Sequence, residues 1–343
     1  MSISIIIPTH NRAEILEYLL IELNNQKGKF EIIIVDDAST DGTRKMIKNI
    51  ALHLKYKLKY IQLKHQVGLP TSRNIGVRHS NHEIVGFIDD DCFPIRNDLF
   101  KQAKKWLKSK KSKIVGVGGP VFFRSTKQNP SLSKIEISSR MIGKINKIIP
   151  EIIGNFYIKP KKPILVDTLP GGNMYFKKGI IYRCMGFNPQ FDGNHYREET
   201  DFCLRAKEYG RIIFDPKMLV NHLRVNYGGC RCKAEKWYSN IISNTTLLIM
   251  KHWKSPIEII TGISLYFFKW IYNLINHKED QRYYNVERNT LFRSILKGFW
   301  QGFKKYFIRS KKLNSIIIKE KLKFAPNTIS ELYKHDLLKA EIS

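Results

Sequence analysis

The sequence predicts an α/β fold, a mostly parallel sheet flanked by helices, followed by a helical C-terminal extension. Three observations predict it. Short runs rich in Ile and Val, at residues 2–7, 31–35 and 84–88, are typical of buried strands. The segments between them carry apolar residues at helical spacing, and strands that alternate with helices form parallel sheets with right-handed crossovers. Beyond residue 229 the apolar pattern is helical throughout.

The elements follow one another regularly over the first 120 residues. The first strand, 2–7, stops at Pro8, and the helix after it has its apolar positions at Ile15, Leu16, Leu19, Leu20 and Leu23. Further strands are expected at residues 31–35, 58–63, 84–88 and 114–117. Further helices are expected around Met46, Ile47 and Ile50, from residues 68–76 onward, and over the lysine-rich residues 101–113 as a solvated outer face. The order is Rossmann-like, but the Gly-x-Gly-x-x-Gly turn of dinucleotide-binding domains is absent after the first strand.

Composition and charge limit the class of partner. The chain has 343 residues, 43% of them hydrophobic, enough for a core in one large or two modest domains. A formal net charge of +29 favours nucleic acid, an anionic membrane surface or phosphorylated substrates. Because no zinc-finger spacing, basic heptad or aromatic RNP-type signature accompanies the lysines, we expect no nucleic acid partner. Five scattered cysteines and an N-terminus without a charged leader predict a cytoplasmic protein.

Three consecutive carboxylates, Asp89, Asp90 and Asp91, follow the apolar run 84–88. Open α/β sheets bind ligands at the carboxyl ends of their strands. In an extended chain Asp89 and Asp91 point the same way, so the pair is suited to one hard divalent metal with room for a phosphate oxygen. Asp90 is then left over. The alternative is a solvated acidic turn.

Several motifs occur in a definite order. They are Pro8-Thr9, Val35-Asp36-Asp37-x-Ser39-x-Asp41, Arg73-Asn74-x-Gly76, Phe87-x-Asp89-Asp90-Asp91, Gly171-Gly172-Asn173, Gly186-Phe187, Arg197-Glu198-Glu199-Thr200-Asp201, Asp215-Pro216 and His222. Over roughly residues 1–225 the chain resembles family 2 glycosyltransferases, which are inverting enzymes of the GT-A fold. The resemblance implies a GT-A catalytic domain at 1–228 and a helical, basic region at 229–343. The catalytic domain divides into a nucleotide-sugar-binding half, 1–120, and an acceptor-side half, 121–228.

The resemblance also implies roles for individual residues. The donor nucleotide is expected to contact Pro8, Thr9, Asn11, Arg12, Asp37, Arg73, Asp89 and Asp90. A divalent metal, Mn²⁺ or Mg²⁺, is expected to be held by Asp91, Asp89 and His222 and to neutralise the departing diphosphate as a Lewis acid. The sugar or the acceptor is expected near Gly171, Gly172, Asn173 and Asp201. Helix caps and turns are alternative roles, for Thr9 and Asn11 among others.

Glu198 and Glu199 begin a predicted helix. Carboxylates in the first turn are stabilised by the helix dipole, which is the simpler explanation for both. An inverting transfer is a single displacement in which one carboxylate deprotonates the acceptor hydroxyl. The family commonly has Glu-Asp at this point, so Glu199 occupies the Asp position. The choice between Glu199 and Glu198 as the base stays open.

The C-terminal region contains the most apolar window of the chain, 256–275. A membrane-spanning helix needs about 20 mainly apolar residues, and the charges of Glu258 and Lys269 weigh against spanning. Clustered aromatic residues and downstream basic residues (Lys297, Lys304, Lys305, Arg309, Lys311 and Lys312) favour an interfacial helix on an anionic leaflet, with the protein peripheral on the inner face of the plasma membrane. An ordinary core helix is the alternative.

The predicted function is therefore a metal-dependent, inverting transfer of a sugar from a nucleotide-diphosphate donor to a glycan or lipid-linked acceptor. One alternative is a processive polysaccharide synthase, which is disfavoured because the Gln-x-x-Arg-Trp motif is absent. Another is a non-catalytic basic protein that binds membranes or nucleic acid on an inactive GT-A fold. The donor base, the sugar, the acceptor and the oligomeric state are left open.

Overall fold

The computed structural model describes residues 2–108, 113–123, 141–146, 151–223, 225, 227–276 and 287–320, with the backbone alone at 151–152 and 308–320. Within these residues an eight-stranded sheet has the order β10-β12-β6-β11-β4-β1-β2-β3. Its strands are β1 (Ile3–Thr9), β2 (Phe30–Asp36), β3 (Lys57–Gln62), β4 (Ile84–Phe87), β6 (Ile114–Gly118), β10 (Ile164–Val166), β11 (Met174–Lys177) and β12 (Arg211–Phe214). Strands β3, β2, β1 and β4 are parallel, and β11 runs antiparallel between β4 and β6.

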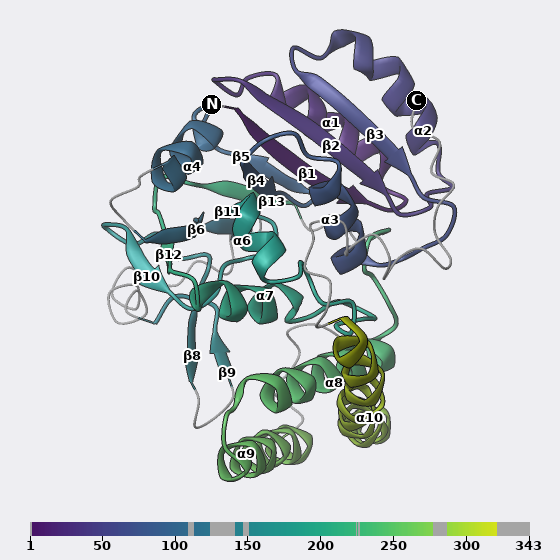
Figure 1. The fold of residues 1–343 in the computed structure, drawn as a ribbon. Coiled ribbons are helices and arrows are strands. Elements are labelled where there is room, and N and C mark those ends of the chain that lie inside the picture. The colour runs from purple at the N-terminus through teal and green to yellow at the C-terminus, as the bar shows by residue number, and fades with distance from the viewer. Residues whose placement is uncertain are drawn as a thin grey trace.

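Helices cover both faces of this sheet (Figure 1). One face packs against α1 (Ala13–Leu23), α2 (Thr43–Ile50) and α4 (Leu99–Lys108), and a short 3-10 helix, η1 (Ala51–His53), follows α2. The other face packs against α3 (Leu69–Arg78), α6 (Lys178–Arg183) and α7 (Glu198–Lys207). The alternation of side chains along a strand explains the two cores: Ile5 of β1 belongs to the first, and its neighbour Ile6 to the second.

A small second sheet extends the edge where the parallel strands end. It has the order β5-β13-β7, from β5 (Cys92–Pro94), β13 (Val220–His222) and β7 (Val121–Phe123). β13 pairs antiparallel with β5, so that His222 lies opposite Cys92. A separate hairpin is formed by β8 (Lys144–Asn146) and β9 (Glu151–Ile153). Residues 124–140 and 147–150, on either side of β8, lie outside the described residues.

The C-terminal region is helical, as expected. It consists of α8 (Ala234–His252), α9 (Pro256–Ile275) and α10 (Arg288–Glu320), which lie below α7 in Figure 1. α8 and α10 pack closely because Gly298 of α10 faces Ile242: a Cβ at this glycine would lie 2.7 Å from the Ile242 Cβ. These helices form a core of their own, with Tyr238, Trp270 and Phe299 among its members.

The α/β architecture, the mostly parallel sheet and the helical extension are confirmed. The helix predicted over 101–113 is present as α4, and residues 109–112 lie outside the described residues. Its interpretation as a solvated outer face needs correction, because α4 buries Leu99, Phe100, Ala103 and Leu107. One face of α4 is therefore part of the core.

The window 256–275 forms α9, but it is not an ordinary core helix. Only Gly262, Tyr266 and Trp270 are buried among its residues. Glu258 completes a capping box with Ser255 at the start of the helix, which explains its charge there. Among the helices of the described chain, none is both long and apolar enough to cross a membrane.

Candidate active site

The candidate site lies at the edge where β1, β2 and β4 end. The register sets Thr9, the last residue of β1, beside Asp36, the last of β2, and Asp37 follows directly. β4 ends at Phe87 next to Ile6 of β1, so the three aspartates 89–91 emerge at the same edge. The clustering of these polar residues at the carboxyl ends of parallel strands agrees with the sequence prediction.

The three aspartates do not continue the strand, which corrects the expected geometry. Asp90 and Asp91 form a turn, in which the backbone N–H of Cys92 donates to the carbonyl oxygen of Asp89 at 3.0 Å. Because of this turn, the side chains of Asp89 and Asp91 contact different partners. Asp89 pairs with Arg73 at 3.0 Å, whereas Asp91 Oδ1 lies 3.1 Å from His222 Nε2. Asp89 and Asp91 therefore do not point the same way.

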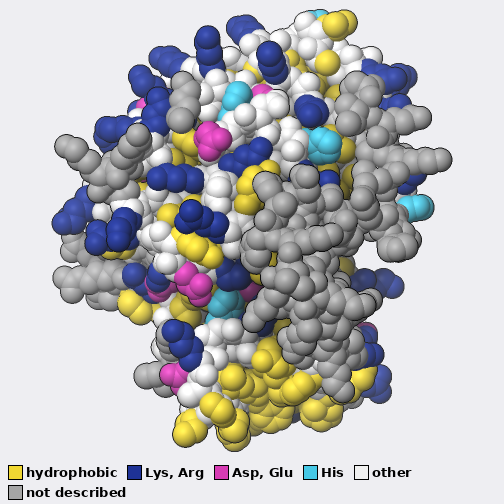
Figure 2. All heavy atoms as spheres, in the orientation of Figure 1, with side chains coloured by type: hydrophobic (Ala, Val, Ile, Leu, Met, Phe, Trp, Pro, Cys, Tyr) yellow, Lys and Arg dark blue, Asp and Glu magenta, His cyan; other side chains and the backbone are white. Residues whose placement is uncertain are grey.

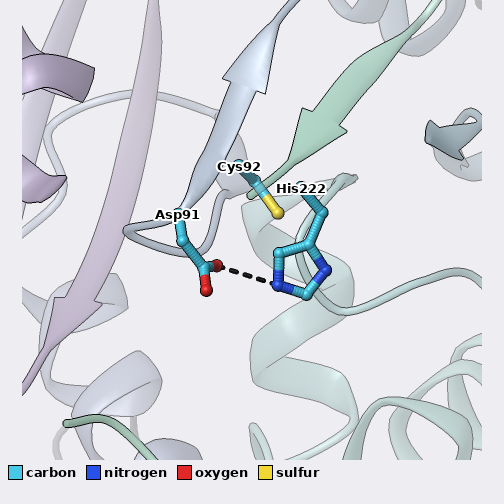
Figure 3. Close-up of side chains that lie close together, drawn as sticks. All are labelled: Asp91, Cys92 and His222. Carbon is cyan, nitrogen blue, oxygen red and sulfur yellow. Dashed lines mark ion pairs between the residues drawn. The ribbon is translucent and has the colours of Figure 1, made fainter. Parts of the chain in front are cut away.

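Asp91, Cys92 and His222 form the single group in the described part of the chain with three ligand atoms within 4.8 Å of one another (Figure 3). Asp91 comes from the turn before β5, and the pairing of β13 with β5 delivers His222. Burial alone would raise the pKa of Asp91, but His222 and Arg12 hold it below its usual value. A carboxylate oxygen beside an imidazole nitrogen suits a divalent ion such as Mn²⁺. Burial raises the pKa of the Cys92 thiol well above its ordinary value, so it is a poorer ligand.

Arg12 binds the same carboxylates from the side of β1. Its guanidinium donates to Asp90 at 2.7 Å, to Asp91 at 3.0 Å and to the backbone oxygen of Tyr227 at 3.0 Å. Asp90 also accepts the hydroxyl of Thr9 at 2.8 Å, so it is a fully used buried group and not a spare carboxylate. Burial, together with the charge of Asp91, raises the pKa of Asp90 to about 6 despite Arg12.

Arg73 connects the aspartate turn to α7. It is 1% exposed and donates to Asp89, to the backbone oxygen of Gly171 at 3.2 Å and to Glu198. Its guanidinium also lies over the ring of Phe187, 5.4 Å from the centroid. In this structure the partners of Arg73 are protein groups, and its contact with the donor nucleotide stays a prediction.

The two candidate bases differ clearly in environment. Glu198 is 1% exposed and paired with Arg73, whereas Glu199 is half-buried, with a hydrogen bond from the Thr200 hydroxyl at 3.2 Å. Burial raises the pKa of Glu199 above its ordinary value, against the lowering effect of the nearby Arg197 and Arg73. Of the two, Glu199 is the carboxylate not committed to a buried ion pair.

Two predicted donor residues organise loops. Asp37 accepts the backbone N–H groups of Val67 at 2.7 Å and Gly68 at 2.9 Å, and burial raises its pKa. Asn11 accepts the N–H of Thr40 at 2.7 Å and so ties the loop after β1 to the loop after β2. Both residues lie at the expected edge, and Pro8 lies within β1 beside Val35. The alternative role of Asn11 as a cap of the first helix is not realised, because Arg12 is the N-cap residue of α1.

Three predicted acceptor residues have other surroundings. Asp201 is fully buried, with His252 at 2.8 Å and Arg205 at 3.0 Å, so it links α7 to α8. Asn173 is also fully buried and donates to the backbone oxygens of Gly119 and Met218. Gly172 lies against Asp89 and Cys92, so the glycine pair remains close to the aspartate turn.

Sequence reasoning missed the segment that covers Arg12. Residues 227–229 pass over its guanidinium, and a Cβ at Gly229 would lie 2.8 Å from Arg12 Cζ. Gly229 has a φ of +56° and its N–H donates to the backbone oxygen of His10 at 2.8 Å. The Gly228-Gly229 pair was the available signal, because two glycines permit this close approach.

Comparison with known proteins identifies the family. The model of "Glycosyl transferase family 2" matches residues 4–183. The chain belongs to this family. Among curated members it is similar to GalNAc(5)-diNAcBac-PP-undecaprenol beta-1,3-glucosyltransferase of Campylobacter jejuni, 33% identical over 62% of this chain and 65% of the relative. It is also similar to poly(ribitol-phosphate) beta-N-acetylglucosaminyltransferase TarS of Staphylococcus aureus, 33% identical over 52% of this chain and 30% of TarS.

Solved structures share the fold of this family 2 chain. A crystal structure of S. aureus TarS, residues 1–349, matches with a TM-score of 0.55 at 17% identity over 88% of this chain and 81% of that one. The mannosyltransferase PcManGT of Pyrobaculum calidifontis, in complex with GDP-Man and Mn²⁺, matches with a TM-score of 0.54 at 17% identity over 89% and 84%. The match covers only part of the first curated relatives: 36% of AglE of Haloferax volcanii and 32% of the chondroitin synthase of Escherichia coli.

Proposed function

We propose that the protein transfers a sugar from a nucleoside-diphosphate donor to a hydroxyl acceptor by a metal-dependent, inverting displacement. The observation that carries the proposal is the link made by Arg73, which binds Asp89 of the aspartate turn and Glu198 of α7. One buried cation thereby connects Asp89 to the start of the helix that carries Glu199. A donor at the strand edge would thus lie near a carboxylate able to act as base.

Asp91 and His222 are the residues that would hold the metal. A bound Mn²⁺ or Mg²⁺ would supply positive charge to the diphosphate as it leaves. Arg12 contributes a second, permanent positive charge at the same place, since it is already bonded to Asp90 and Asp91. The complex of PcManGT with GDP-Man and Mn²⁺ supports the use of a metal on this fold.

The proposed displacement is a single step. The acceptor hydroxyl oxygen forms a bond to the anomeric carbon while the bond from that carbon to the diphosphate oxygen breaks, and the diphosphate leaves with the electron pair. The hydroxyl proton passes to the carboxylate of Glu199. Because attack and departure occur on opposite faces of the sugar ring, the anomeric configuration inverts.

Glu198 is the weaker candidate for the base. Its carboxylate is buried and neutralises Arg73. If Glu198 took up the acceptor proton, this buried ion pair would be lost. Glu199 follows it on the same turn of α7 and is half-buried. The raised pKa of Glu199 makes its carboxylate a stronger base than an exposed glutamate.

The donor and acceptor classes are supported by similar proteins. TarS forms a complex with UDP-GlcNAc, and PcManGT forms one with GDP-Man. The names of two curated relatives specify a ribitol-phosphate polymer and an undecaprenol diphosphate glycan. For this chain we propose a nucleotide-sugar donor of that kind and a glycan or lipid-linked acceptor.

We also propose that the C-terminal helices lie on an anionic membrane surface at the cytoplasmic side. The outward face of α9 is apolar: Ile257, Ile260, Phe268, Tyr272 and Ile275 are each more than 60% exposed. Figure 2 shows hydrophobic side chains gathered at the lower end of the molecule, over α9. Lys297 and Lys304 of the neighbouring α10 supply positive charge, whereas Lys305 is paired with Asp192. The side chains of Arg309, Lys311 and Lys312 lie outside the described residues. An apolar helix face beside lysines is typical of interfacial binding.

The experiment that tests this function is a panel of UDP-, GDP- and TDP-sugars, with release of the nucleoside diphosphate measured in the presence of Mn²⁺ or of EDTA. We expect one donor class to be hydrolysed slowly without acceptor and only with metal. Absence of turnover and of nucleotide binding across the whole panel would instead favour a non-catalytic protein on this fold.

A further inference from the structure

A cavity of about 640 Å³ lies between residues 189–193 and the helices α8 and α10. It is distinct from the aspartate turn, since none of the groups that bind Arg12, Arg73 or His222 lines it. It is also close to α7, because residues 189–193 lead directly into the start of the helix that carries Glu199. The proposed donor site therefore assigns no ligand to this cavity.

The lining of the cavity is positively charged. It includes three lysines, Lys236, Lys304 and Lys305, and one acidic residue, Asp192. Lys305 is already satisfied, with Asp192 at 2.6 Å and the side-chain oxygen of Asn244 at 2.8 Å. Lys236 and Lys304 therefore leave two positive charges that no acid of the lining balances, and this excess favours an anionic ligand.

The lining also presents an unused hydrogen-bond donor. Asn240 is 7% exposed, and its amide nitrogen Nδ2 has no partner within the described part of the structure. A buried donor without a partner costs free energy, which a ligand acceptor would recover. Because lysines and an amide N–H all donate, the complementary ligand is rich in acceptor oxygens, as a diphosphate is.

Trp300 joins the cavity to an apolar surface. Its side chain lines the cavity, and Lys304 Nζ lies over the indole ring, 4.7 Å from the ring centroid. The residue is nevertheless 61% exposed. Exposed apolar residues continue from it along α10 at helical spacing: Phe292, Leu296 and Phe307. A charged cavity that opens onto an apolar track fits an amphiphile, with its polar group inside and its hydrocarbon along the helix.

We infer that the cavity binds the diphosphate of a lipid-linked acceptor, with the lipid along the exposed row of α10. The inference rests on the proposed function, whose acceptor it names. Two hydrogen bonds hold the segment that precedes α7 against the helices of the cavity: Asn244 of α8 donates to the backbone oxygen of Asp192 at 3.1 Å, and Gln190 donates to that of Lys305 at 3.0 Å. The acceptor sugar would extend from the cavity along residues 193–198 toward Glu199.

Binding of farnesyl diphosphate, measured by calorimetry, tests this inference. EDTA in the buffer prevents metal-dependent binding of the diphosphate at the aspartate turn. Inorganic diphosphate and farnesol serve as the two partial ligands. We expect farnesyl diphosphate to bind more tightly than either, and the double variant Lys236→Ala/Lys304→Ala to weaken it by at least about 10-fold, since charge-assisted bonds are lost. Asn240→Asp should weaken it similarly by placing a negative charge in the lining.

The matched control is Lys254→Ala, which removes an exposed lysine of the C-terminal region that does not line the cavity. It should leave the affinity within about twofold of wild type, because its charge is not part of the lining. Equal affinity in the double variant and in the wild type would overturn the inference. Equal affinity for diphosphate and farnesyl diphosphate would also overturn it, and would favour a water-soluble sugar–phosphate polymer. Donor hydrolysis, measured in parallel on the wild type, tests the proposed function separately.

Discussion

Arg73 and Glu198 form a buried ion pair that joins α3 to α7, with side chains only 1% and 2% exposed. The same guanidinium binds Asp89, so one arginine balances two carboxylates from different parts of the chain. The pair explains why the adjacent glutamates differ: Glu198 is committed to a buried ion pair, and Glu199, which is not, is the proposed base.

Replacement of Arg73 by Met should destabilise the protein strongly. Removing one partner of a buried pair leaves an uncompensated charge, which typically costs about 3–5 kcal/mol. The free energy of unfolding from urea titration measures this loss. Arg96→Met is the matched control, because Arg96 pairs with Asp98 but its side chain is 48% exposed, and an exposed pair contributes at most about 1 kcal/mol. Similar losses in the two variants would refute the assigned role of Arg73.

Asp91→Asn and His222→Ala should each weaken Mn²⁺ binding. Each removes one of the two atoms that lie 3.1 Å apart at the candidate metal site, and we expect at least about a 10-fold loss of affinity by calorimetry. Cys92→Ser should bind Mn²⁺ nearly as well as wild type, because a buried, protonated thiol contributes little. Unchanged affinity in Asp91→Asn would remove Asp91 from the ligand set.

The buried carboxylate of Asp201 should make the free energy of unfolding depend on pH under acidic conditions. Despite burial, Arg205 and His252 hold its pKa at about 2, compared with 3.8 in the unfolded chain. A carboxyl with a lowered pKa gives stability that is present above 3.8 and is lost as the pH falls toward 2. The difference in unfolding free energy between wild type and Asp201→Asn should therefore shrink by about 2 kcal/mol over that window. A difference that stays constant with pH would contradict this assignment.

Vesicle binding should depend on the outward face of α9. Ile260→Ser/Phe268→Ser should reduce sedimentation with phosphatidylglycerol-containing vesicles by about 10-fold or more, because each apolar side chain contributes about 1.5–3 kcal/mol when buried. Added salt should weaken binding of the wild type by screening its positive charge. Leu52→Ser is the control, since Leu52 is 89% exposed but lies in η1 of the catalytic domain. Binding that resists salt and the double substitution would exclude this face.

Much of the fold was predictable because local patterns determine it. The strands β1, β2 and β4 are buried on both faces, so each leaves a continuous apolar run that can be found in the sequence directly. α1 likewise buries all five of its predicted apolar positions. The antiparallel strand β11 between β4 and β6 was not predicted, since pairing between distant segments leaves no local signal.

The residues of the candidate site were predicted better than their partners. Thr9, Asp37 and Asp91 do lie at one edge, but the turn at Asp90 depends on hydrogen bonds that composition does not reveal. Asp201 matched a family position, and only the structure shows His252 of α8 against it. Ion pairs between residues more than 50 positions apart require the tertiary fold, so the sequence could not have revealed them.

The most direct test of the proposed mechanism is the turnover of Glu199→Gln, with the donor found in the nucleotide-sugar panel. Glutamine keeps the size and hydrogen bonding of the side chain but cannot accept the acceptor proton. We predict a fall in turnover of about 100-fold or more with donor affinity near that of wild type. In the wild type, turnover should fall with decreasing pH at a value above the ordinary pKa of glutamate, because the base must be ionised and its pKa is raised. Near-full transfer by Glu199→Gln would contradict the claim that this carboxylate is the base.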